Sequence, residues 1–286
     1  MPDDVAMVDC RPPVASSTPA PVVFDSPHSG RHYPADFRPA LPLRQLQGGE
    51  DRHVDRLIAR APEHGAWLVT AGFARTYIDP NRDIADIDPD LLDGPWPGRV
   101  DPGGHSRHGI GLVFRTLGDG TPIYDRRLSV AEVQGRIDRC WRPYHTALEQ
   151  ALSRAGEGWR RVWHLNCHSM LPVGDALSPD PGCRRADMVL GDRGGRSCEP
   201  AFTALVATVL RDLGYSVAIN DPYQGAWIVA RHGRPQEGRH SLQIEINRAL
   251  YMDLTTLAPH AGFDRLQADL GDLAREVCAH ARRHGA

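Results

Sequence analysis

The chain has 286 residues, 41% of them hydrophobic and 24% charged, a composition typical of one large folded domain with a sizeable core. The formal net charge of −3 gives no indication of nucleic-acid binding, and all 33 basic residues are arginine, which excludes a Schiff-base or P-loop lysine. No window of about 18 consecutive apolar residues exists, so we expect no membrane span, and six cysteines without C-x-x-C spacing favour free thiols in a reducing cytoplasm.

The first 20 residues are acidic and rich in proline. They lack the basic start and apolar middle of a signal peptide. We therefore expect residues 1–20 to form a flexible tail and residues 21–286 to form a single domain.

The first half of the domain begins with a short buried strand at 22–24. Residues 48–64 have apolar side chains at the i, i+3, i+4, i+7 spacing of a helix, with Glu50 and Asp51 in its first turn. Strands are expected at 67–70 and 75–78. Residues 79–124 are rich in Pro, Gly and Asp, and a long stretch of this kind is typical of an active-site loop.

The second half alternates helices with strands. A Ser129–Glu132 capping box begins a long helix that Pro143 should kink, and the strand at 162–165 follows. Ser197 is expected to cap a helix that Gly214 stops, before strands at 215–220 and 240–251 and a helix at 262–283. This order predicts an α/β three-layer sandwich with a mostly parallel mixed sheet, in which ligands bind beyond the carboxyl ends of the strands.

Two histidines each follow an apolar run at such an end. His28 lies in "PVVFDSPHSG" and His168 in "RVWHLNCHSM". A catalytic zinc site needs about three His, Asp or Glu ligands and an open position. Glu50 or Asp51 could supply the carboxylate, although either histidine could also be an ordinary loop residue.

Glu245 lies in the apolar strand "SLQIEINRALY". With a period of two, Gln243, Glu245 and Asn247 share one face, and Leu242, Ile244 and Ile246 share the other. A glutamate in such a strand costs free energy unless it is paired or used. It is either a general base or the partner of a buried arginine such as Arg248.

Arginines in loop segments provide candidate carboxylate-binding groups. Arg82 and Arg248 each stand beside an asparagine and a carboxylate, in "DPNRD" and "EINR". Such forks suit a substrate that carries carboxylates. Further candidates for this role are Arg115, Arg126 and Asn247.

Nine segments in order, from about residue 21 to 255, resemble the N-formylglutamate amidohydrolase family. They are "DSPHSGRHYP", "EDRHVD", "YIDPNRD", "LDGPWPG", "PIYDRRLS", "NCHSM", "RADMVLGDR", "GYSVAINDPYQGAWI" and "LQIEINRALYM". The resemblance implies a phosphorylase/hydrolase-like α/β fold related to zinc carboxypeptidases. It also implies metal-dependent hydrolysis of N-formyl-L-glutamate to formate and L-glutamate, a step in one route of histidine degradation.

The resemblance also assigns roles to residues. His28 and His168 would be imidazole ligands of a divalent metal, most simply Zn²⁺, with Asp51 as the carboxylate ligand and Glu50 as its rival. Glu245 would be the general base, and Arg82 would bind a substrate carboxylate or the developing oxyanion. The expected partner is a small N-acyl amino acid; the oligomeric state is left open.

Three alternatives remain at this point. Cys167 could be the nucleophile of a thiol hydrolase, although chain neighbours in a strand point to opposite sides. The chain could be a non-catalytic binder of acidic amino-acid derivatives. It could also perform the same chemistry on another N-acyl amino acid.

Overall fold

The computed structural model describes residues 6–286, and its centre is one seven-stranded sheet of order β1-β3-β2-β4-β7-β5-β6. The strands are β1 Val8–Arg11, β2 Val22–Ser26, β3 Trp67–Ala71, β4 Val162–Met170, β5 Met188–Gly191, β6 Val217–Ile219 and β7 Arg239–Asn247. The four central strands run parallel, and antiparallel pairing occurs at β1–β3 and β5–β7. The predicted mixed, mostly parallel sheet is confirmed.

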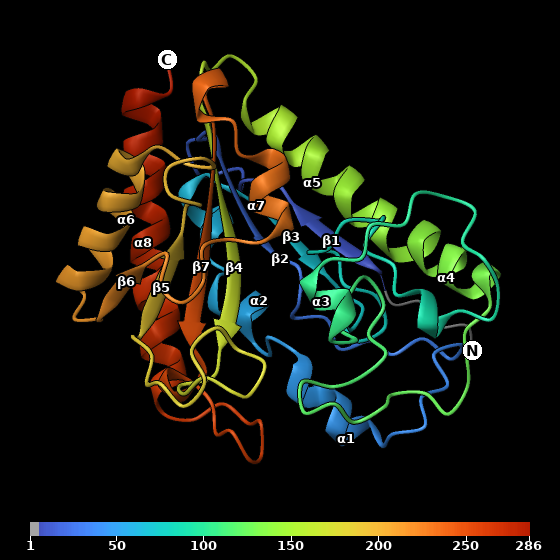
Figure 1. Cartoon of the computed structure of the whole chain (residues 1–286). Coiled ribbons are helices and arrows are strands. Elements are labelled where there is room, and N and C mark those ends of the chain that lie inside the picture. The colour runs from blue at the N-terminus through green and yellow to red at the C-terminus, as the bar shows by residue number, and fades with distance from the viewer. Residues whose placement is uncertain (1–5) are drawn as a thin grey trace.

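Helices cover both faces of the sheet and make the predicted sandwich (Figure 1). One face packs on α2 Val54–Leu57, α6 Pro200–Asp212 and α8 Gly262–His284. The other packs on α4 Val130–Arg136, α5 Arg142–Ala155 and α7 Trp227–His232. The short helices α1 Leu43–Leu46 and α3 Gly104–Arg107 lie in the connecting segments.

Strands β4 and β7 pair in parallel over nine residues each, from Val162↔Arg239 to Met170↔Asn247. The predicted strand at 162–165 therefore continues through His168. Leu242, Ile244 and Ile246 enter the core under α6 and α8, as the two-residue period predicts. The opposite face of the same strands carries polar side chains, because β4 places Asn166 and His168 there beside Gln243 and Glu245 of β7.

The expected flexible tail is wrong for part of its length. Val8–Arg11 form β1, which pairs with Val8 opposite Ala71 and Arg11 opposite Leu68 at the edge of the sheet. Ala20 is buried in the core. Residues 1–5 lie outside the described part of the chain, and the division into one domain from residue 21 stays a prediction.

The predicted helix at 48–64 is also wrong, since only Val54–Leu57 is α-helical. Short 3₁₀ turns at Gln47–Gly49 and Ala61–His64 flank it. His53 has a left-handed backbone (φ 69°), and Pro62 lies in the second turn. Both are incompatible with a continuous α-helix.

Two smaller expectations need correction, and a third is confirmed. The expected strand at 75–78 is wrong, because residues 75–77 form a turn in which the Tyr77 amide donates to the Ala74 carbonyl. Pro200 stands at the start of α6, so Glu199 is the cap instead of Ser197. The capping box of Ser129 is confirmed. Near Pro143 the helix contains a π-helical turn at Ile137–Trp141.

Across residues 6–286, the helices are all too short or too polar to cross a bilayer.

Candidate metal centre

A cavity of about 720 Å³ lies at the carboxyl ends of the parallel strands. His28 follows β2, His168 lies near the end of β4, and Glu245 lies near the end of β7. Residues from the long 79–124 segment also line the cavity, among them Asn81, Arg82 and His105. The segment therefore lines the cavity, and its expected role as an active-site loop stays a prediction.

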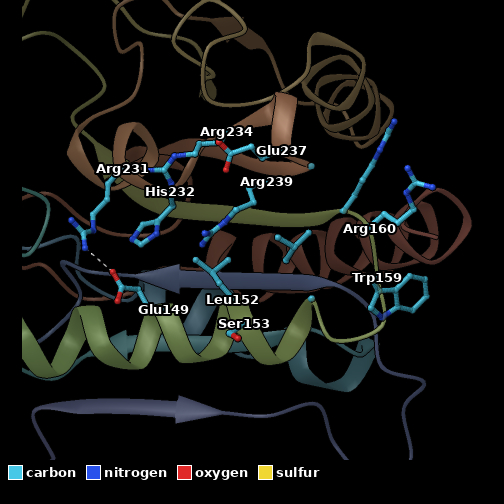
Figure 2. Close-up of a pocket in the computed structure, with 14 residues that line it drawn as sticks. Glu149, Leu152, Ser153, Trp159, Arg160, Arg231, His232, Arg234, Glu237 and Arg239 are labelled. Atoms are coloured by element: carbon cyan, nitrogen blue, oxygen red, sulfur yellow. Dashed lines mark hydrogen bonds and ion pairs between the residues drawn. The ribbon is translucent and has the colours of Figure 1, made fainter.

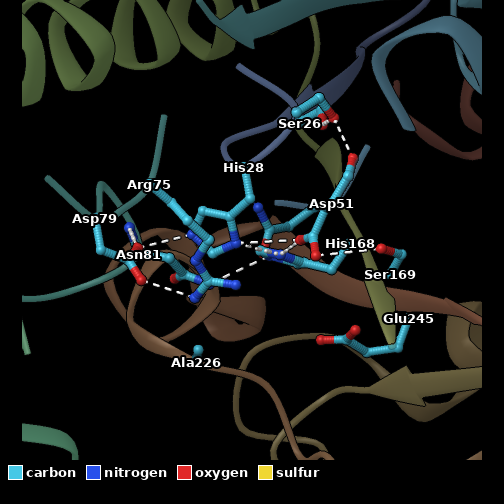
Figure 3. Close-up of polar contacts among 12 residues, drawn as sticks. Ser26, His28, Asp51, Arg75, Asp79, Asn81, His168, Ser169, Ala226 and Glu245 are labelled. Carbon is cyan, nitrogen blue, oxygen red and sulfur yellow. Dashed lines mark hydrogen bonds and ion pairs between the residues drawn. The ribbon is translucent and has the colours of Figure 1, made fainter. Parts of the chain in front are cut away.

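Three ligand atoms meet at the base of the cavity (Figure 3). His28 Nδ1 and His168 Nδ1 are 3.0 Å apart, and Asp51 Oδ2 lies 3.2 Å from the first and 3.1 Å from the second. All three side chains are buried. A tetrahedral zinc ion with bonds of about 2.0–2.1 Å separates its ligands by about 3.3 Å, so the nearly equilateral triangle has the right size for one.

The hydrogen bond that each ring makes through Nε2 indicates whether the proton of the ring lies on Nε2 or on Nδ1. His28 Nε2 lies 2.7 Å from Asp79 Oδ1, and His168 Nε2 lies 2.7 Å from Asn166 Oδ1. Both oxygens accept, so in a ring that carries one proton we assign that proton to Nε2. Two Nδ1 lone pairs then face a carboxylate oxygen, an electron-rich donor set that a cation would stabilise.

Short-range contacts hold the His28 loop against the Asp51 segment. The Asp51 amide donates to the His28 carbonyl at 3.0 Å. Ser29 Oγ donates to the Asp51 carbonyl and accepts from the Asp55 amide, both at 3.0 Å. These hydrogen bonds join two candidate ligands that are distant in sequence. On its other side the same loop lies close to the chain after β3, where Gly30 is required because a Cβ there would lie 2.1 Å from the Phe73 carbonyl oxygen.

Arg248 orients the carboxylate of Asp51. Its Nη2 donates to Asp51 Oδ1 at 3.0 Å, and Ser169 Oγ donates to the same oxygen at 3.2 Å. The other carboxylate oxygen of Asp51, Oδ2, is thus left to face the two histidine Nδ1 atoms. The other nitrogens of Arg248 donate to Ser169 Oγ and the Gly48 carbonyl. Each nitrogen of the guanidinium therefore has a partner within the protein. Because Arg248 also lines the cavity, its expected role in holding a substrate carboxylate stays a prediction.

Glu245 stands beside His168 in the β4–β7 register and lines the cavity. Gln243 Nε2 donates to its Oε1 at 2.8 Å, whereas no described residue from 6 to 286 donates to Oε2. Burial raises the pKa of Glu245 to about 7, because the low-dielectric site disfavours the charged form. Its carboxylate lies apart from the triangle in Figure 3, so Glu245 is positioned beside the candidate ligands without joining them.

Glu50 is outside the donor triangle. The Tyr33 hydroxyl donates to its Oε1, and Arg52 Nη1 lies 3.4 Å from its Oε2. Burial raises the pKa of the Glu50 carboxyl. Of the two rival carboxylates, the structure brings Asp51 to the histidines and leaves Glu50 in a separate polar contact.

Three predicted substrate-binding residues do not line the cavity. Arg115 pairs with Asp88 at 2.6 Å, and Arg126 pairs with Glu132 at 2.7 Å. Asn247 accepts a hydrogen bond from the Ala249 amide and so caps a 3₁₀ turn. These expectations were wrong because a loop arginine or asparagine cannot be assigned to a cavity wall without the path of the loop.

Arg82 does line the cavity. Two residues near it, Asp79 and Asn81, were not predicted from the sequence. Arg75 Nη2 lies 2.8 Å from Asp79 Oδ2, and Arg82 Nη2 lies 3.9 Å from the same oxygen. Arg82 lowers the pKa of His105 to about 4, so that ring is neutral at pH 7. Asp79 and Asn81 both belong to "YIDPNRD". The several polar residues that directly follow an apolar segment there could have indicated these two positions as site residues.

Cys167 points away from the cavity. It belongs to the core cluster under α6 and α8, on the face of β4 opposite His168. Burial raises the pKa of its thiol well above the usual range. A thiol of this kind is a poor nucleophile, because the thiolate is the reactive form.

A second cavity, of about 530 Å³, lies at the opposite ends of β4 and β7, where Val162 and Arg239 begin the two strands (Figure 2). Its wall includes five arginines, of which Arg231 pairs with Glu149 at 2.7 Å. The residues predicted from sequence to form the site all lie away from this cavity. The candidate metal centre therefore belongs to the carboxyl ends of the strands alone.

Fold and site together define an α/β protein with a mixed sheet and a His-Asp-His donor set in a cavity at its carboxyl edge. The family model described as N-formylglutamate amidohydrolase matches residues 20–252. The chain belongs to the N-formylglutamate amidohydrolase family, which confirms the resemblance and makes it a hydrolase that acts on an amide.

Individual relatives agree with this membership. An N-formylglutamate deformylase of Pseudomonas aeruginosa is 30% identical over 263 residues, covering 90% of this chain and 89% of the relative. One from Pseudomonas putida is 29% identical over 244 residues, covering 82% and 83%. The crystal structure of N-formylglutamate amidohydrolase from Ralstonia eutropha JMP134 is similar at 46% identity, with a TM-score of 0.91 and coverage of 98% and 99%.

Proposed function

We propose that this protein hydrolyses N-formyl-L-glutamate to formate and L-glutamate with the help of a divalent metal, zinc, held by His28, Asp51 and His168. The observation that carries the proposal is the triangle of Nδ1, Oδ2 and Nδ1 atoms with edges of 3.0–3.2 Å, with Glu245 beside it. The names of the relatives supply the substrate.

The chemistry that a bound zinc ion supplies is Lewis acidity, which lowers the pKa of water and polarises a carbonyl group. Glu245 is the general base. Its Oε2 takes a proton from the attacking water and later delivers it to the leaving amine. A raised pKa suits both roles, because the carboxyl group can release and accept a proton near neutral pH.

Arg75 and Arg82 form the positive wall that meets a substrate carboxylate. Asp79 lies between them and neutralises only part of their charge. Both guanidiniums line the cavity that contains the donor triangle. A carboxylate bound there would be oriented by charge-assisted hydrogen bonds, which fix both position and direction.

A substrate panel tests the proposed function. With zinc present, kcat/KM should be highest for N-formyl-L-glutamate and lower for N-formyl-L-aspartate, N-formyl-L-glutamine and N-acetyl-L-glutamate. A higher value for another N-acyl amino acid would assign the same chemistry to a different substrate. Thermal stabilisation by N-formyl-L-glutamate without any turnover would instead favour a binding protein.

Asp51→Asn and Glu50→Gln form a matched pair of charge-removing substitutions at adjacent positions. Asp51→Asn should lower zinc affinity by at least about tenfold, because it removes an anionic ligand. Glu50→Gln should keep full zinc occupancy, since Glu50 lies outside the triangle. Zinc per protein after dialysis, measured by elemental analysis, checks both variants, and the reverse pattern would make Glu50 the ligand.

Cys167→Ala is expected to retain catalytic activity. The substitution removes one buried sulfur atom and should cost about 1 kcal/mol of stability, as for a typical core substitution. Treatment of the native wild-type enzyme with iodoacetamide should likewise leave turnover unchanged, because the thiol is buried. Loss of turnover in both experiments would support the thiol-hydrolase alternative.

A further inference from the structure

A buried polar network lies behind the candidate metal centre, within the sheet. Asp25 of β2 is fully buried on the face that α5 covers. Its Oδ1 accepts from His164 Nε2 at 2.9 Å and from Asn166 Nδ2 at 2.8 Å, and its Oδ2 accepts from the Tyr144 hydroxyl. An ionised carboxylate is costly inside a sheet unless it is fully satisfied, and here both oxygens have donors.

Asp25 is held in its charged form. Burial alone would raise the pKa of this carboxyl, but His164 and the hydrogen bonds from Tyr144 and Asn166 lower it below its usual value. At neutral pH the carboxylate can therefore only accept hydrogen bonds. This property determines the orientation of the groups that contact it.

The orientation passes from Asp25 to His168 through one amide. Because Asp25 Oδ1 accepts, Asn166 must present its NH₂ group to it and its Oδ1 to the other side. Asn166 Oδ1 lies 2.7 Å from His168 Nε2, so this nitrogen must carry the proton. A ring with this single proton has its lone pair on Nδ1, which faces His28 and Asp51.

We propose that Asp25 is a positioning residue: through Asn166 it selects the tautomer of His168 that directs the Nδ1 lone pair at the metal centre. This inference rests on the proposed function, because it requires His168 to be a ligand. Asp25 itself touches neither the triangle nor the cavity. It acts only through the direction of two hydrogen bonds.

A second amide favours the opposite tautomer. Asn81 Nδ2 lies 3.2 Å from His168 Nε2, and its own orientation is set by the Ile228 amide, which donates to Asn81 Oδ1 at 2.8 Å. A donor at that position would prefer an unprotonated Nε2. The 2.7 Å contact with Asn166 is shorter, and an oxygen could not approach an unprotonated nitrogen so closely. Asp25 therefore determines which tautomer of His168 is preferred, because without Asp25 the side-chain amide of Asn166 is free to reverse.

Two substitutions of similar size test the proposal. Asp25→Leu removes the acceptor and should weaken zinc binding by about 10- to 100-fold, the range for loss of a supporting hydrogen bond around a metal. Asp25→Asn can still turn an oxygen toward Asn166 and its NH₂ toward Tyr144, so it should restore affinity close to wild type. Tyr144→Phe also removes a hydrogen bond from Asp25 but leaves the acceptor, and it too should bind zinc as the wild type does.

Zinc dissociation constants come from competition with a chromophoric chelator, at a temperature where circular dichroism shows each variant to be folded. Equal affinities for wild type and Asp25→Leu would overturn the proposal, as would equal losses in all three variants. A cobalt(II) absorption spectrum altered only in Asp25→Leu would support it, because it reports the ligand field rather than stability.

A measurement on the wild type covers the case in which Asp25→Leu does not fold. In the metal-free protein, ¹⁵N-histidine NMR should show a proton on His168 Nε2, with the signal identified by its absence in His168→Ala. An unprotonated Nε2 would overturn the proposal. A wild type that binds no zinc would refute the proposed metal site, while the NMR result would still report on Asp25 and Asn166.

Discussion

Glu245→Gln is expected to lower kcat by about 10²- to 10⁴-fold, the usual contribution of a general base, while zinc stays bound. Glutamine preserves the size of the side chain and can still meet Gln243, but it cannot take a proton from water. The metal ligands are other residues, so the zinc content of the variant should equal that of the wild type. Turnover near the wild-type value would remove Glu245 from the mechanism.

The pH dependence of kcat/KM for the wild type and for Glu245→Gln is a second test of Glu245 as the general base. A base works in its deprotonated form, so kcat/KM should rise as pH increases through the pKa of Glu245. Burial raises that pKa to about 7, and a bound cation would lower it. The acidic limb of the wild-type profile should thus lie at or below about pH 7 and be absent from the residual activity of Glu245→Gln.

His168→Ala should reduce bound zinc from about one ion per chain to nearly none. The triangle loses one of its three donor atoms, and two protein ligands do not make a stable zinc site. Wild-type protein in zinc at 100 times its dissociation constant should gain about 2.7 kcal/mol of stability from binding, and the variant should gain almost nothing. Thermal unfolding with and without zinc measures this difference.

His240→Ala is the matched control for this experiment. His240 is also a buried strand histidine, but it lies at the start of β7, where it stacks on Trp163 far from the triangle. Its removal should lower stability while leaving zinc content and zinc-dependent stabilisation intact. If both alanine variants lost zinc, the loss in His168→Ala would reflect damage to the fold, and if neither did, His168 would not be a ligand.

Arg248 and Arg82 show that neighbouring residues in the sequence do not by themselves predict the contacts of an arginine. Each stands beside an asparagine and a carboxylate in sequence, and both were expected to bind substrate. In the structure both arginines line the cavity, but their protein partners differ. Arg248 donates to Asp51, Ser169 and the Gly48 carbonyl, whereas Arg82 donates to the carbonyl groups of Asn81 and Ile110. The similar sequence neighbours of the two arginines do not determine these partners, because most of them come from other segments of the chain.

The amino-acid sequence by itself determined the alternation of strands and helices, the polar face of β7 and the family, because periodicity and ordered motifs are local properties. It also indicated His28, Asp51, His168 and Glu245 as a group. Only the tertiary structure decided that Asp51 rather than Glu50 meets the histidines, that β1 completes the sheet edge, and that Asp25 stands behind His168. These outcomes depend on strand order and register, which place residues more than 100 positions apart within hydrogen-bonding distance and have no counterpart in local spacing.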